Sequence, residues 1–143
     1  MNMAKLVLLI SIFFLTSCGT TGHISFYNFN ASKAEIENEI MSTINDDSTY
    51  TVPKKWLSHT SDDYFKRIYI YFKDKPEELY QIGFTNEADW QDSPSSRLGL
   101  ISVYSGHQFQ YESDLSKKEI QRITKRFETQ ILSKVKYPYS KTE

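Results

Sequence analysis

The chain has 143 residues, which is the length of one ordinary domain. It carries 17 basic and 18 acidic side chains, so it lacks the excess of positive charge that neutralises nucleic-acid phosphates, and we expect no nucleic-acid partner. Its 10 Tyr, 9 Phe and 2 Trp residues are too many for a disordered chain, and its single cysteine excludes a disulfide bond within the chain.

The first predicted element is an export signal. Lys5 forms a short basic region, residues 6–15 form an apolar run, and small residues follow this run. About ten apolar residues span only ~15 Å as a helix, half of the ~30 Å hydrocarbon core of a bilayer. We therefore expect this segment to be removed rather than to remain as a transmembrane helix.

The residues Leu15, Thr16, Ser17 and Cys18 close this signal and resemble the lipobox of bacterial lipoproteins. In that family the chain is cut just before the cysteine, whose thiol receives a diacylglycerol and whose new amino group is often acylated too. The resemblance covers residues 1–18 only. It implies that residues 1–17 are removed and that Cys18 anchors the chain to a lipid bilayer.

The segment after the cysteine bears on location. Residues 18–22 are interpreted as the lipidated cysteine with a short flexible tether, and residues 23–143 as a single domain. Enterobacterial lipoproteins with an aspartate after the cysteine stay at the inner membrane, whereas this chain has Gly19. By resemblance, a Gram-negative source favours the outer membrane and its periplasmic side, while the cell membrane of a Gram-positive source stays open.

The domain is predicted to begin with a strand over residues 23–29, which alternates and is rich in aromatic side chains. A helix follows, because isoleucines recur every four residues from Ile36 and because Ser32 and Glu35 form a capping box. Residues 45–63 are expected to connect this helix to the next strand, with Trp56 and Leu57 packed against the core.

Strands are predicted in the middle of the chain. Residues 66–72 and 79–84 flank a turn and predict a β-hairpin. Residues 97–105 and 107–112 flank Gly106, which predicts either a second hairpin or one bent strand.

A last helix is predicted from the capping box of Ser116 and Glu119, with an end near Tyr137. One apolar stripe at helical spacing supports it: Ile120, Ile123, Phe127, Ile131 and Val135.

These elements predict an α+β fold in the order β-α-β-β-β-(β)-α. Both helices need an apolar surface to cover, so we expect a two-layer sandwich in which they lie on one face of an antiparallel sheet of four to five strands. Strict alternation along the strands assigns these residues to the covered face: Ile24, Phe26, Ile68, Ile70, Phe72, Tyr80, Ile82, Phe84, Ile101, Val103, Phe109 and Tyr111.

The opposite face is the predicted binding surface. It would carry aromatic, amide and aliphatic groups with little charge, which suits an envelope protein or a glycan as partner. The alternative is that another segment, such as the loop with Trp56 or Trp90, covers this face. The binding candidates are Tyr69, Tyr71, Tyr104, Gln81 and Gln108, and Leu98, Leu100 and Gln110 share their pleat.

No sequence motif for a nucleotide, a metal or a covalent catalyst is present, and we predict no cofactor. His59 precedes Asp62 and Asp63 closely enough to suggest a metal or proton-transfer site, although turn formation also explains these residues. The sequence therefore predicts a membrane-anchored envelope lipoprotein with a non-catalytic binding or accessory domain, and the alternative is an anchored hydrolase that uses the loop around His59.

Two further groups of charges are expected to be solvated. Glu77 and Glu78 follow Pro76 in the predicted turn. The basic residues of the last helix are expected on its outer face, with contact to anionic lipid as the alternative. They are Lys117, Lys118, Arg122, Lys125 and Arg126.

Overall fold

The computed structural model describes residues 22–60, 66–84 and 93–142. The predictions for Cys18, Asp62, Asp63 and Trp90 lie outside these described residues.

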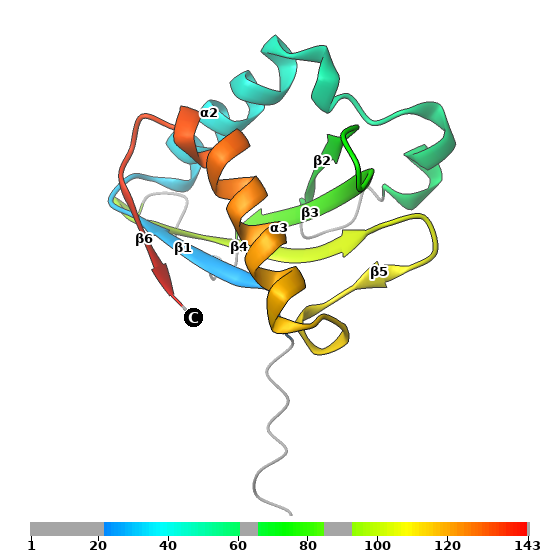
Figure 1. Ribbon diagram of the computed structural model, residues 1–143. Helices are drawn as coiled ribbons and strands as arrows, with labels where there is room; N and C mark the ends of the chain where they lie inside the picture. The colour runs from blue at the N-terminus through cyan, green and yellow to red at the C-terminus, as the bar shows by residue number, and fades with distance from the viewer. Residues whose placement is uncertain (1–21, 61–65, 85–92, 143) are drawn as a thin grey trace, which may run out of the picture.

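The described residues form an antiparallel sheet in the strand order β2-β3-β4-β1-β6, with the short β5 paired to β4 (Figure 1). The first and last strands of the chain thus lie side by side. The strands are β1 (Ser25–Phe29), β2 (Ile68–Phe72), β3 (Glu78–Phe84), β4 (Ser96–Tyr104), β5 (Phe109–Gln110) and β6 (Tyr139–Thr142).

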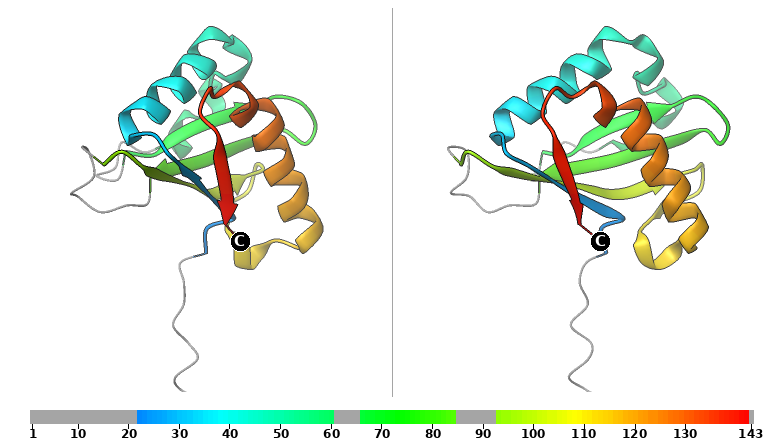
Figure 2. Two further views of the ribbon diagram at one scale, coloured as in Figure 1. Left: turned by 90° about the vertical axis from the view of Figure 1, so that its left-hand side faces the viewer. Right: turned by 60° about the vertical axis from the view of Figure 1, so that its left-hand side comes forward.

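Two helices, α2 (Lys33–Asp46) and α3 (Lys117–Gln130), lie on the same face of this sheet (Figure 2). Each begins with its predicted capping box, in which Ser32 or Ser116 accepts a hydrogen bond from the backbone three residues later. The predicted α+β two-layer architecture is confirmed. Within the described part of the chain, no helix is long and apolar enough to cross a bilayer.

The structure decides one prediction that the sequence leaves open and differs from two features of the predicted chain. Residues 105–107 form a hairpin turn between β4 and β5, where Gly106 has a φ of +107°, a left-handed conformation that glycine adopts without strain. Helix α3 ends at Gln130 and a 3₁₀ turn, Leu132–Lys134, follows it. The chain then returns as the unpredicted strand β6, whose four residues are exposed.

The core lies between the helices and the sheet, but β4 contributes different residues from those predicted. Leu98, Leu100 and Val103 are buried in this core, whereas Ile101 is not. Leu100 pairs with Ile82 and Ser102 with Gln81, so Ile101 is an extra residue in β4 that turns to the opposite face. The predicted alternation was wrong for Leu98, Leu100 and Ile101 because this bulge resets it.

Strand β1 also buries side chains other than the predicted ones. Tyr27 and Phe29 are fully buried under the helices, while Phe26 lies on the opposite pleat and is only partly buried. Both pleats of β1 carry aromatic side chains, so the sequence pattern does not decide between them. The prediction for Ile24 is confirmed, and that for Phe26 was wrong.

Three further burial predictions were wrong. Phe109 packs against the cluster around Trp56 on the opposite face of the sheet, and Tyr111 is 40% exposed. Leu57 is 51% exposed, because the 3₁₀ turn Lys54–His59 directs Trp56 and not Leu57 toward the sheet.

Candidate functional site

The predicted aromatic face is covered at one end. Trp56 packs edge-on against both Tyr71 and Tyr104, with ring centroids 5.4 Å apart in each pair. Only 7% of Trp56 and 6% of Tyr104 remain exposed. At this end of the sheet the expectation of an exposed face was wrong. The alternative prediction, that the segment with Trp56 covers the face, is correct here.

The polar members of the predicted surface are also not gathered at the exterior. Gln81 is buried; its amide donates to the Tyr69 hydroxyl at 3.1 Å and accepts from Ser102 at 2.7 Å. Gln108 is exposed in the turn before β5. A binding role for Tyr69, Tyr71 and Gln108 stays a prediction, while Gln81 and Tyr104 have little surface to offer.

His59 is engaged by the same aromatic cluster. Its ring stacks on Tyr104 with centroids 4.2 Å apart, and its Nε2 lies 3.0 Å from the Tyr104 hydroxyl. Among the described residues, no group of three or more histidine, cysteine or acidic side chains is arranged to hold a metal ion. The structure thus gives His59 a packing partner.

A buried ion cluster joins β3 to α3. Glu78 is 2% exposed and accepts hydrogen bonds from Arg122 at 2.5 and 2.9 Å and from Arg126 at 2.9 Å. The Tyr80 hydroxyl donates to the same carboxylate at 3.0 Å. The expectation of solvated charges was wrong for Glu78, Arg122 and Arg126, because the register of β3 directs Glu78 under the helix.

This Glu78 cluster also fixes the β2–β3 hairpin. Arg126 donates to the backbone carbonyls of Asp74 and Pro76 and lies over the Phe72 ring. The hydrogen bonds that Arg122 donates to Glu78 raise the pKa of Arg122. Burial raises the pKa of the Tyr80 phenol, and the negative charge of Glu78 adds to this rise. The charges of the cluster are therefore paired with one another, and its role is to stabilise the fold.

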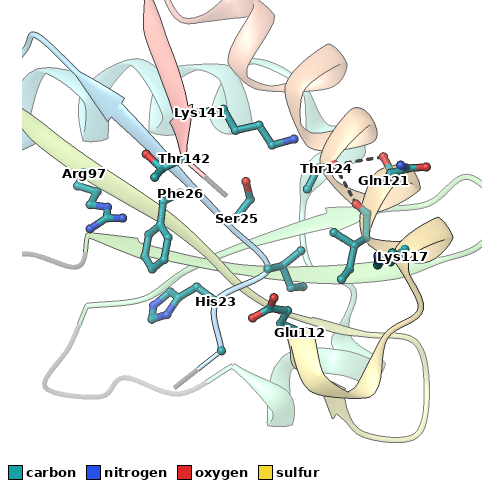
Figure 3. Close-up of a pocket in the computed structure, with 13 residues that line it drawn as sticks. His23, Ser25, Phe26, Arg97, Glu112, Lys117, Gln121, Thr124, Lys141 and Thr142 are labelled. Carbon is teal, nitrogen blue, oxygen red and sulfur yellow. Dashed lines mark hydrogen bonds between the residues drawn. The ribbon is translucent and has the colours of Figure 1, made fainter. Parts of the chain in front are cut away.

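The best candidate site is a pocket of about 910 Å³ at the N-terminal end of β1, which we call the N-terminal pocket. Figure 3 shows side chains of α3 on one of its sides and His23, Phe26 and Arg97 on the other. β6 pairs with β1 only from Phe26 onward, so the preceding residues of β1 border the pocket instead of a strand.

The charged side chains of the N-terminal pocket are mostly basic. Arg97, Lys117 and Lys141 come from β4, α3 and β6, and Glu112 is the one acidic residue among those that line it. Lys141 forms an ion pair of 2.8 Å with Glu128 of α3. Lys117 is exposed and forms no ion pair with a described residue.

One wall of the pocket is aromatic. His23 stacks on Phe26 with ring centroids 4.7 Å apart, and the Arg97 guanidinium lies 4.0 Å from the centre of the same ring. The Arg97 Nε atom is buried and has no hydrogen-bond partner among the described residues. This guanidinium is therefore held in place by packing while part of its donor capacity is unused.

Ser25 contributes a buried hydroxyl to the pocket. It is 5% exposed, and its Oγ atom forms no hydrogen bond of ordinary geometry with a described residue. Its neighbour Tyr27 donates to Glu128 at 3.0 Å. Burial raises the pKa of Tyr27, and the nearby Ser25 hydroxyl counteracts part of this rise. Ser25 therefore places in the lining of the pocket a hydroxyl whose hydrogen-bonding capacity the described residues do not fully use.

Gly22, at the edge of the pocket, packs closely against Glu112. A Cβ atom added to Gly22 would lie 3.2 Å from the Glu112 Cβ atom, so the chain passes directly against the 3₁₀ turn Glu112–Asp114. This contact fixes where the tether leaves the domain.

Comparisons of the chain with protein-family models, with curated proteins and with solved structures gave no match.

Sequence reasoning missed the N-terminal pocket because its residues come from four distant parts of the chain. Of its charged side chains, the sequence pattern singles out Lys117 alone, as one of several basic residues on the last helix. The unpredicted strand β6 brings Lys141 to the pocket, and no local spacing signals that contact.

Proposed function

We propose that this protein is a membrane-anchored lipoprotein of the bacterial cell envelope, and that its domain is a non-catalytic binding or accessory module. The observation that carries the proposal is the short distance in sequence between the lipobox-like residues and the folded domain. Three residues, 19–21, separate Cys18 from Gly22, which already lines the N-terminal pocket. A thiol acylated at this position would hold the domain next to the bilayer surface.

The geometry favours binding over the alternative of an anchored hydrolase. His59, the residue on which a hydrolase would depend, is stacked on Tyr104 and hydrogen-bonded to it. The N-terminal pocket instead offers unused polar groups at Ser25 and Arg97. With Gly19 after the cysteine, the outer membrane is the proposed location in a Gram-negative cell, and the cell membrane in a Gram-positive cell.

The proposal is tested by labelling cells with radioactive palmitate. The native protein and the control variant Thr20→Ala, which changes only the tether, should incorporate label and sediment with membranes. Cys18→Ala should incorporate none and keep residues 1–17, because the processing enzyme requires the acylated thiol. A Cys18→Ala protein that is still labelled and cut would refute the assignment of Cys18 as the anchor.

A further inference from the structure

The position of the N-terminal pocket is bounded by the length of the tether. Cys18 precedes Gly22 by four residues, and an extended chain spans at most ~3.6 Å per residue, or about 14 Å here. Gly22 lines the pocket. If Cys18 is acylated, as the proposed function states, the pocket opens within a short distance of the lipid headgroups.

The charge of the pocket suits an anion. Arg97, Lys117 and Lys141 approach from separate elements, and Glu128 neutralises only Lys141. Glu112 packs against Gly22 at the edge of the pocket. Because headgroups of anionic lipids attract juxtamembrane basic side chains, the pocket and the bilayer have complementary charges.

Two buried donors mark where a ligand oxygen would bind. The Ser25 hydroxyl and the Arg97 Nε atom form no hydrogen bond of ordinary geometry with a described residue. A buried donor without an acceptor is unfavourable, so each is stabilised when an oxygen of a ligand or of water reaches it. Phosphate oxygens accept strong hydrogen bonds from guanidinium and hydroxyl donors.

Apolar groups line the same pocket beside these donors. Phe26 forms its aromatic wall, and Ile120 of α3, which is partly buried, also lines it. The combination of cationic, hydroxyl and apolar surface fits a phosphate that carries an esterified glycerol better than it fits a bare inorganic ion.

We propose that the N-terminal pocket binds the phosphate of an anionic glycerophospholipid in the membrane that carries the anchor. This inference rests on the proposed anchoring at Cys18. Headgroup binding would add a second contact with the bilayer and fix the orientation of the domain on it. A soluble glycerol phosphate presents the same chemistry, so the test separates these two sources.

The test uses the full acylated chain, reconstituted through its own anchor into lipid nanodiscs. One preparation contains phosphatidylcholine alone, and others contain increasing fractions of phosphatidylglycerol. Backbone amide chemical shifts of Ser25, Gln121 and Thr124 report on the pocket. Glycerol phosphate and inorganic phosphate are added separately to the phosphatidylcholine preparation.

We expect phosphatidylglycerol to shift these three amides. Lys117→Gln should raise the fraction of phosphatidylglycerol needed for a half-maximal shift about fivefold, which corresponds to ~1 kcal/mol for one basic group at a membrane surface. Lys118→Gln is the matched control, because Lys118 is the next residue of α3 and does not line the pocket. It should leave the titration unchanged.

The remaining outcomes decide the source and the site. If glycerol phosphate produces the same shifts with the same dependence on Lys117, the pocket binds phosphate from a soluble ligand. Equal losses in Lys117→Gln and Lys118→Gln, or no shift with any probe, would overturn the proposal. Failure of the anchor is seen separately, as a chain that does not co-elute with the nanodiscs.

Discussion

The start and the middle of helix α3 carry similar basic residues in different surroundings. Arg122 and Arg126, in its middle, converge on the buried carboxylate of Glu78. Lys117, at its start, faces the open N-terminal pocket and forms no ion pair with a described residue. One basic helix can therefore hold the fold together in its middle and keep charge available for a ligand at its start.

Breaking the Glu78 cluster should have the largest effect. Glu78→Gln removes the charge that neutralises two guanidinium groups, of which Arg126 is only 10% exposed. Removal of one partner from a buried ion pair costs roughly 3 to 5 kcal/mol of unfolding free energy. Urea denaturation measures the loss. Glu77→Gln is the control on a partly exposed ion pair with Lys55, and an equal loss in both variants would contradict a special role for Glu78.

The two arginines of the Glu78 cluster should differ. The Arg126 side chain is 10% exposed and also binds two backbone carbonyls, while that of Arg122 is 39% exposed. We expect Arg126→Ala to lower the unfolding free energy by about 2 to 3 kcal/mol and Arg122→Ala by about 1 kcal/mol. The same urea titrations compare them. A larger loss for Arg122 would show that the hydrogen bonds from Arg126 to the backbone of the β2–β3 hairpin contribute little to stability.

A smaller effect is expected at alkaline pH. The pKa of Tyr80 is raised in the folded protein by burial, whereas a phenol in the unfolded chain ionises near pH ~10. The unfolded state therefore loses its proton first, and the stability present below pH ~10 declines as the pH rises further. Tyr80→Phe should flatten this decline in thermal melts between pH 9 and about 11. The exposed-residue control Tyr111→Phe should leave it unchanged.

At the start of α3, substitution should hardly change the stability of the protein. Lys117→Gln removes an exposed charge and should change the unfolding free energy by less than about 0.5 kcal/mol. Urea denaturation measures this value beside that of Glu78→Gln. A loss above ~2 kcal/mol would show that Lys117 also stabilises the fold and would remove the contrast between the start and the middle of α3.

The elements of the fold were predictable because their signals are local. The capping boxes at Ser32 and Ser116 begin both helices as predicted, and Ile36, Ile40 and Ile44 face the core. The hairpin of β2 and β3 follows from two alternating segments around a turn. Such signals lie within one short continuous segment of the chain.

The faces of the strands were less predictable. The bulge at Ile101 reverses the alternation in the middle of β4, and its partner strand is needed to see this. In β1, Phe26 and Tyr27 are adjacent aromatic residues, and only the packed helices decide which is buried. A period-of-two pattern alone does not contain this information.

The sites depended on contacts between distant residues. Glu78 meets Arg122 across 44 positions of the chain, so its burial has no local signature. The N-terminal pocket likewise needs β6 to place Lys141 beside Ser25, and that strand has four exposed residues with no apolar pattern. By contrast, the predicted anchor at Cys18 is a short local motif, which sequence alone can suggest.

The start of the mature chain decides how far the N-terminal pocket lies from the bilayer, since the tether sets that distance. The direct measurement is mass spectrometry of the N-terminal peptide of the protein extracted from its native membranes. The account predicts a peptide that begins at Cys18 and carries a diacylglycerol on its thiol, with or without a third acyl chain on its amino group. A peptide that retains residues 1–17, or that begins at an unmodified Cys18, would contradict it.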